Sequence, residues 1–209
     1  MAQTSDAKQD DRSLLERVLG LITDVHQGEG GTALIMAANV FLVMTAYSLI
    51  KPVREGLILA MKSGAEYKSY MGGAIAVALL VAVPAYARFA DRLQRNRLVV
   101  GVTLFFASHL VLFWLASALP SVRPYLGLVF YLWLGIFNMM VVAQFWAFAN
   151  DLYTEAQGKR LFPLLGLGQT GGAVAGATLA VVLVKTIGAF LMLLVGAGLV
   201  AGCAFLAQV

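Results

Sequence analysis

The side chains most capable of specific chemistry lie within residues 47–57, which read YSLIKPVREGL. Tyr47, Lys51 and Arg54 are separated by four and then three residues, so one face of a helix would carry a phenol and two cations. Cations on a membrane helix usually face a cavity, and two of them beside an aromatic ring suit a polyanion that can also stack. We therefore take these three residues as candidate substrate ligands.

Pro52 lies between the two cations and cannot donate a hydrogen bond to the carbonyl of Ser48, which predicts a kink with a free acceptor. A second interpretation stays open. In that case Lys51 and Arg54 only end an apolar helix, reach toward the membrane surface and pair with Glu55.

A stripe of glycines at four-residue intervals marks a second candidate feature, formed by Gly168, Gly172 and Gly176. This spacing lets two membrane helices approach closely, so we assign the three glycines to helix packing. The overlapping sequence GLGQTG has the spacing of a dinucleotide-binding loop, but no strand precedes it and no βαβ unit follows.

Other kinds of catalytic or metal chemistry find little support in the sequence. The chain has one cysteine, Cys203, and two well-separated histidines without partners at ligand spacing. One cysteine allows neither an internal disulfide nor a cysteine-based metal site. A nucleophile with its base is also missing. We therefore expect no enzyme, no cofactor, no metal and no nucleic-acid partner.

The composition shows which elements must position these residues. Of 209 residues, 60% are hydrophobic and 12% are charged, whereas a soluble domain has about 45–50% and about 25%. Uncharged stretches of 19 to 27 residues recur six times, at residues 32–50, 69–87, 98–122, 124–150, 161–184 and 186–209. About 20 helical residues cross a bilayer, and the stretches lack the alternation of barrel strands. The sequence thus predicts an all-α membrane protein with six transmembrane helices.

The distribution of basic residues predicts the orientation of these helices. With the N-terminus inside, nine Lys and Arg residues fall on the cytoplasmic side and six outside. This asymmetry favours a multi-pass protein of the inner membrane with both termini in the cytoplasm.

The first 31 residues form a separate, acidic segment before the six-helix domain of residues 32–209. The segment has six acidic and three basic residues. Apolar residues recur at helical spacing from Leu14 to Val25, which predicts an amphipathic helix on the inner membrane surface. A solvated tail remains the alternative.

Three sequence blocks carry a resemblance to a known family. Residues 145–150 read FWAFAN, residues 155–168 read EAQGKRLFPLLGLG, and the YSLIKPVREGL segment is followed by GAE at residues 64–66. Together they resemble the bacterial and plastid type nucleotide transporters, the ATP:ADP antiporter family. The resemblance implies nucleotide transport and ATP binding. In that family a first-helix cation helps to bind the nucleotide phosphates, and the matching position is Arg54, with Lys51 at the preceding basic position.

The basic loop of residues 87–97, ARFADRLQRNR, resembles a loop motif of the major facilitator superfamily. Asp91, Arg92 and Arg95 stand in the places of the motif, while both of its glycines and its last arginine are replaced. The resemblance implies the N-terminal six-helix half of a major facilitator fold, alternating access, and a cytoplasmic gate formed by these three residues. Topology alone would also account for a basic loop here.

Two departures from the family pattern widen the range of functions that we expect for this chain. The family has an acidic residue in the fourth helix, where this chain has Leu134. The chain also supplies one six-helix half and ends within an apolar run, so we expect a fragment that needs a C-terminal half or a second copy. The expected function is ATP/ADP exchange across a lipid bilayer. The alternatives are transport of another anionic or phosphorylated solute, and a non-transporting half-length membrane partner.

Overall fold

The structure is a computed structural model that describes residues 14–20, 23–90 and 92–207. Over these residues it is helical throughout and contains no strand. The helices are α1 (Leu14–Leu19), α2 (Gly30–Leu59), α3 (Gly64–Ala90), α4 (Arg95–Ser117), α5 (Arg123–Leu152), α6 (Glu155–Thr186) and α7 (Ala189–Leu206). Six of them, α2 to α7, are long and apolar enough to cross a membrane. The predicted all-α fold with six transmembrane helices is therefore confirmed.

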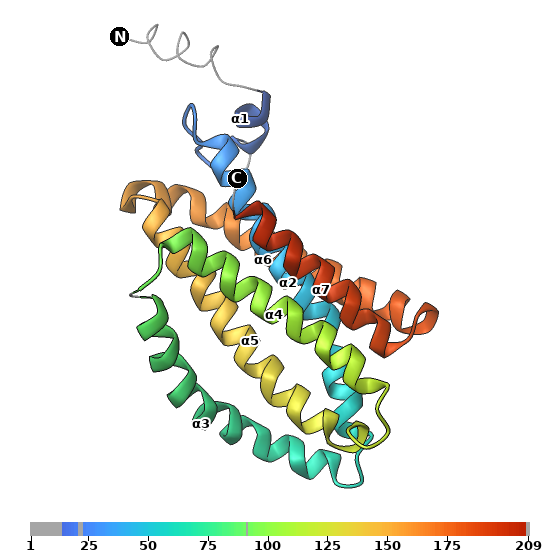
Figure 1. Cartoon of the computed structure of the whole chain (residues 1–209). Helices are drawn as coiled ribbons and strands as arrows, with labels where there is room; N and C mark the ends of the chain where they lie inside the picture. The colour runs from blue at the N-terminus through green and yellow to red at the C-terminus, as the bar shows by residue number, and fades with distance from the viewer. Residues whose placement is uncertain (1–13, 21–22, 91, 208–209) are drawn as a thin grey trace, which may run out of the picture.

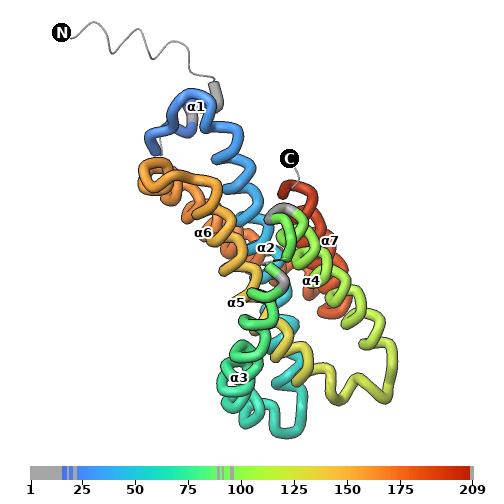
Figure 2. The backbone as a smooth tube through the Cα atoms, turned by 60° about the vertical axis from the view of Figure 1, so that its left-hand side comes forward, coloured from blue at the N-terminus to red at the C-terminus, as the bar shows by residue number. Residues whose placement is uncertain are grey.

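Helix α2 forms the centre of the bundle, as Figures 1 and 2 show. It packs along α6 and also contacts α7, α5 and α3. Its buried residues include Ala33, Val40, Leu49 and Ile50, which do not share a single face. A helix that is apolar on all sides is expected in the interior, and this explains its central place.

Most pairs of helices that contact each other still do so when the first three membrane helices exchange places with the last three, although the contacts of α2 are more extensive than those of α5. The α2–α6 contact corresponds to α5–α3, and the α2–α7 contact corresponds to α5–α4. The α4–α7 and α2–α5 contacts each map onto themselves. This pattern is the one expected of two three-helix repeats.

Helix α3 departs from this correspondence because it is splayed away from the bundle (Figure 1). The apolar middle of α3 contains no buried residue, whereas α2 is largely buried. Leu80 and Val81 on α3 are strongly exposed. The outer faces of α3 are thus available to lipid or to another protein segment.

The segment before α2 folds back onto the bundle. Helix α1 ends at Leu19, so it is shorter than the spacing through Val25 indicates. Val25 is fully buried, and the backbone N–H of Gly28 donates to Glu16 Oε1 at 2.6 Å. Gly28 has a φ of 87°, which is costly for residues with a Cβ.

Candidate functional site

Helix α2 runs through residues 47–57 without ending. It includes Pro52 and continues to Leu59, so neither Lys51 nor Arg54 forms the end of the helix. One part of the second interpretation does hold, because Arg54 pairs with Glu55.

Arg54 is the more enclosed of the two candidate cations, with 11% of its side chain exposed, whereas Lys51 is exposed. Its Nη2 lies 2.5 Å from Glu55 Oε1, and its Nε donates to the same oxygen at 3.2 Å. The guanidinium carbon lies 4.2 Å from the ring centre of Tyr131 on α5. A cation stacked on an aromatic ring and paired with a carboxylate is held in one orientation, which suits bidentate recognition of phosphate.

Lys68 brings a second cation to the same place from α3. Its Nζ lies 2.6 Å from Glu55 Oε2, so the two oxygens of one carboxylate serve two cations. We call Arg54, Glu55, Lys68 and Tyr131 the Arg54 cluster. It joins α2, α3 and α5, and its two cations and one carboxylate leave a net positive charge. Such a cluster can attract a polyanion.

Tyr47 and Lys51 stand outside this cluster. Lys51 is exposed, and it forms no ion pair within the described residues. Tyr47 is half-buried and packs against the hydrophobic core. The three candidate ligands therefore share one helix, but only Arg54 contacts groups from other helices that could help to hold a substrate.

The residues expected to form the cytoplasmic gate are only partly described. Asp91 lies outside the described residues, and so does the side chain of Arg95, the first residue of α4. Arg92 is exposed in the turn between α3 and α4. The gate thus remains a prediction.

The glycine stripe of α6 lies against the backbone of α2. A Cβ at Gly168 would come within 2.7 Å of the Ala37 carbonyl oxygen. At Gly172 and Gly176 a Cβ would overlap the carbonyl oxygens of Phe41 and Thr45. The backbones of the two helices therefore approach too closely for any larger residue at these positions.

One ion pair ties the segment before α2 to the start of α6. Arg160 donates to both oxygens of Glu29 at 3.0 Å, and Gln157 donates to Glu29 Oε1 at 3.0 Å. Arg160 also donates to the carbonyl oxygen of Asp24 at 2.6 Å. Hydrogen bonds from Arg160, opposed by burial and aided by Gln157 and the backbone of His26, lower the pKa of Glu29 to about 2.

Sequence reasoning missed the partners in both charged groups. The sequence alone did not place Lys68 beside Glu55 or Arg160 beside Glu29. Glu55 and Glu29 were the available signals, because a carboxylate at the end of an apolar stretch needs a cation nearby. Tyr131 carried no signal for its stacking on Arg54.

Leu134 on α5 stands where the resemblance implies an acidic residue. Its side chain is fully buried in the core. Around Leu134 the structure thus offers apolar packing in place of a carboxylate.

Comparison with known proteins assigns this chain to a family. The sequence profile of the TLC ATP/ADP transporter family matches residues 8–118, just over half of the chain. The chain belongs to the TLC ATP/ADP transporter family. The matched region includes the Arg54 cluster except Tyr131, and TLC membership together with six membrane helices indicates a multi-pass membrane protein.

Individual relatives are distant members. ADP,ATP carrier protein 1 of Rickettsia conorii is 23% identical over 182 residues, which covers 73% of this chain. ADP,ATP carrier protein 1 of Rickettsia prowazekii is 24% identical over 181 residues, again 73% of this chain. The chain spans only 36% of the length of each of these carriers. No solved structure matches the chain.

Proposed function

We propose that this TLC-family chain is the nucleotide-binding, six-helix part of an ATP/ADP exchange carrier. The observation that carries the proposal is the Arg54 cluster, in which two cations and an aromatic ring from three helices meet around one carboxylate. Arg54 and Lys68 would hold phosphate oxygens by charge-assisted hydrogen bonds, with Glu55 giving up its contacts as the polyphosphate enters. Exposed Lys51 would steer the anion, and Tyr47 would border the base or sugar.

The proposed carrier works by alternating access as one half of a major facilitator fold. The exchange symmetry of the helix contacts supports this, since each half of such a fold contains two inverted three-helix repeats. The exposed faces of α3 are consistent with a second six-helix unit. Asp91, Arg92 and Arg95 would form the gate that closes the cytoplasmic side. The protein would lie in the inner membrane with both termini in the cytoplasm.

The test is binding of labelled ATP and ADP to the purified chain in lipid nanodiscs. Arg54→Ala is expected to abolish saturable binding, because it removes the most enclosed cation. Arg123→Ala is the matched control, since Arg123 also lies over an aromatic ring, 5.5 Å from the centre of Phe190, outside the cluster. Undiminished binding by the Arg54 variant, with normal insertion, would refute the assignment.

The activity itself is tested in a complete TLC carrier. Arg54→Ala at the aligned position is expected to abolish uptake of labelled ATP while membrane insertion stays normal. Uptake at the unsubstituted rate would contradict the role given to this arginine.

The buried Leu134 favours a second candidate, a carrier of another phosphorylated or anionic solute. Counterflow with ATP, ADP, inorganic phosphate and sugar phosphates separates the two. Exchange confined to the nucleotides supports the first proposal, and a preference for the smaller anions supports the second.

A further inference from the structure

The carboxylate of the Arg54 cluster already serves the cations of the protein itself. Glu55 Oε1 lies 2.5 Å from Arg54 Nη2, and Glu55 Oε2 lies 2.6 Å from Lys68 Nζ and is buried. Proteins usually bind Mg²⁺ through one or two carboxylates together with substrate phosphates and water. A metal ion at Glu55 would stand between two cations that share this carboxylate, and like charges repel each other.

The described chain offers no further set of metal ligands near Glu55. Glu66 on α3 is exposed and precedes Lys68 by two residues, so the two side chains do not share a face of the helix. The other described acidic residues lie toward the opposite end of the bundle, before α2 or around the turn between α5 and α6: Glu16, Asp24, Glu29, Asp151 and Glu155. Within the described residues, no three His, Cys, Asp or Glu side chains come together as a metal site.

The cations of the cluster, in contrast, can be reached by an arriving anion. Lys68 has 43% of its side chain exposed, and Arg54 has 11%. The guanidinium of Arg54 is stacked on Tyr131, so its position is fixed before an anion arrives. An anion thus meets Lys68 first and reaches Arg54 as it displaces Glu55.

Mg²⁺ and these two cations need the same oxygens of a nucleotide. A metal ion bound to ATP bridges oxygens of the β- and γ-phosphates and neutralises part of their charge. Arg54 and Lys68 would contact those oxygens by charge-assisted hydrogen bonds, whose strength depends on the negative charge of the acceptor. Chelation therefore weakens the attraction to the cluster and also occupies the atoms that the cluster would bind.

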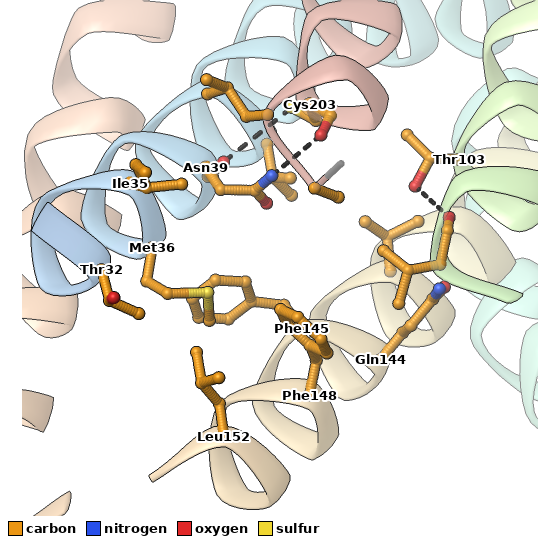
Figure 3. Close-up of a pocket in the computed structure, with 15 residues that line it drawn as sticks. Thr32, Ile35, Met36, Asn39, Thr103, Gln144, Phe145, Phe148, Leu152 and Cys203 are labelled. Atoms are coloured by element: carbon orange, nitrogen blue, oxygen red, sulfur yellow. Dashed lines mark hydrogen bonds between the residues drawn. The ribbon is translucent and has the colours of Figure 1, made fainter. Parts of the chain in front are cut away.

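The cavity between α2, α4, α5 and α7 is not suited to the phosphates (Figure 3). It has a volume of about 360 Å³, and its described lining residues include no Asp, Glu, Lys or Arg. Phe145 and Phe148 belong to its wall. An unpaired charge is costly in such surroundings. Selection by phosphate charge thus belongs to the Arg54 cluster.

We infer, on the basis of the proposed function, that the Arg54 cluster binds ATP and ADP in their metal-free form and discriminates against their Mg²⁺ complexes. The substrate class is then the free nucleoside diphosphate or triphosphate anion. Mg²⁺ acts on this site by removing substrate, because it chelates the phosphates that Arg54 and Lys68 would hold.

Binding to the purified chain in lipid nanodiscs tests the inference without any substitution. Labelled ATP in EDTA is compared with the exchange-inert complex of ATP and tetraamminecobalt(III), whose metal cannot leave the phosphates during the measurement. Free ATP is expected to bind at least about tenfold more tightly than this complex. Added MgCl₂ is expected to lower the apparent affinity for total ATP in step with the chelated fraction, and to do so more than KCl at equal ionic strength, which only screens charge.

Reversal of the charge at Lys68 locates the discrimination. Lys68→Glu removes a cation and places a second carboxylate beside Glu55, so the preference for free ATP over the cobalt complex is expected to disappear. Lys62→Glu is the matched control, because it makes the same change of charge at an exposed position in the turn before α3. This control is expected to keep the preference.

The outcomes distinguish the inference from the proposed function. Absence of saturable ATP binding in EDTA would overturn both. Saturable binding with equal affinities for free ATP and the cobalt complex would overturn the inference alone, and so would an affinity that does not change when Mg²⁺ chelates the nucleotide. Full preference for free ATP in the Lys68→Glu variant would show that the discrimination does not arise at the Arg54 cluster, which also overturns the inference.

Discussion

Arg54 and Glu55 are neighbours in the sequence, and Lys68 from α3 contacts the same carboxylate. One carboxylate pairs with two cations that come from different helices. In the absence of Glu55 the two cations would repel each other within a partly buried site. The carboxylate therefore holds the cations together, and under the proposed function it also occupies the place that a phosphate group would take.

Replacing Glu55 by glutamine separates these two effects. Glu55→Gln keeps the shape but removes the resident negative charge, so ATP affinity is expected to rise by about threefold to tenfold. The gain should shrink as salt is raised, because screening weakens the added attraction. Titration of labelled ATP at two ionic strengths measures this, and weaker binding at both would show that Glu55 mainly orients Arg54.

Removing the positive charge of Lys68 is the opposite test to removing the negative charge of Glu55. Lys68→Ala is expected to lower ATP affinity by about threefold, a modest loss because 43% of this side chain is exposed. Lys62→Ala is the control, since Lys62 is exposed in the turn before α3. Equal losses in the same nucleotide titration would mean that only the overall positive charge matters.

Among the elements, α2 and α6 lie so close together that a Cβ at Gly172 or Gly176 would overlap a carbonyl oxygen of α2. The single O–H of Thr45 lies within hydrogen-bond distance of two carbonyl oxygens, that of Phe41 on its own helix at 2.7 Å and that of Gly172 on α6 at 3.2 Å. Small residues and hydroxyl groups are the usual means of joining membrane helices, because lipid offers little hydrophobic drive for their association.

Gly172→Ala tests this contact with the smallest possible change. A Cβ at this position would overlap the Phe41 carbonyl oxygen, so the protein is expected to lose about 1–3 kcal/mol of stability. Gly171→Ala is a neighbouring control, because a Cβ there would meet the Phe41 ring at an ordinary 3.6 Å. Thermal unfolding in detergent micelles compares the two variants, and equal melting temperatures would refute the packing role.

The docking of the N-terminal segment on α6 is expected to depend on pH through Glu29. Its pKa is lowered from 4.5 to about 2, so its contribution is complete above pH 4.5 and is lost as pH falls toward 2. Glu29→Gln should therefore cost up to about 3 kcal/mol at neutral pH, and this cost should vanish as pH falls below about 2. The measurement is thermal unfolding of both proteins between pH 2 and 7.

A matched control for this titration lies at the start of α6. Glu155 pairs with Lys159 at 2.7 Å, but both side chains are largely exposed, so Glu155→Gln should leave the unfolding profile nearly unchanged. A difference between wild type and Glu29→Gln that does not vary with pH would contradict the role given to the Glu29 carboxylate.

The six long helices could be predicted because each contains a long stretch free of charge. The end of α2 could not be placed, since Lys51, Arg54 and Glu55 interrupt the apolar pattern while the helix continues to Leu59. The Arg54 cluster was also only partly foreseen. Its stacking on Tyr131 joins residues far apart in sequence and depends on how α2 and α5 pack.

In the whole molecule, the two charged groups lie at opposite ends of the helix bundle, so the membrane orientation determines which group faces the cytoplasm. Arg54 lies near the end of α2, Lys68 near the start of α3, and Tyr131 in the third turn of α5. These helix ends lie at the same side of the bundle (Figure 1). The Glu29–Arg160 pair lies at the opposite side, where α2 and α6 begin.

The charge balance predicts which side faces the cytoplasm. Lys51 and Arg54 lie within α2 and do not belong to a loop. Leaving them out of the outer loops lowers the outer count of basic residues from six to four, against nine on the inner side. Alkaline phosphatase fused after Gln94 is therefore expected to be inactive, and the same enzyme fused after Lys62 is expected to be active.

Activity of the phosphatase fused after Gln94 would show that the protein has the opposite orientation. The side from which a nucleotide first reaches the Arg54 cluster would then also be the opposite one. In the expected orientation the Arg54 cluster lies near the outer end of the bundle, so under the proposed function a nucleotide arriving from outside would meet Arg54 and Lys68 first. In the reversed orientation the same cluster would meet cytoplasmic nucleotide first. The fusion result thus decides which pool of nucleotide the cluster samples first, because the positions of its residues within the helices are fixed.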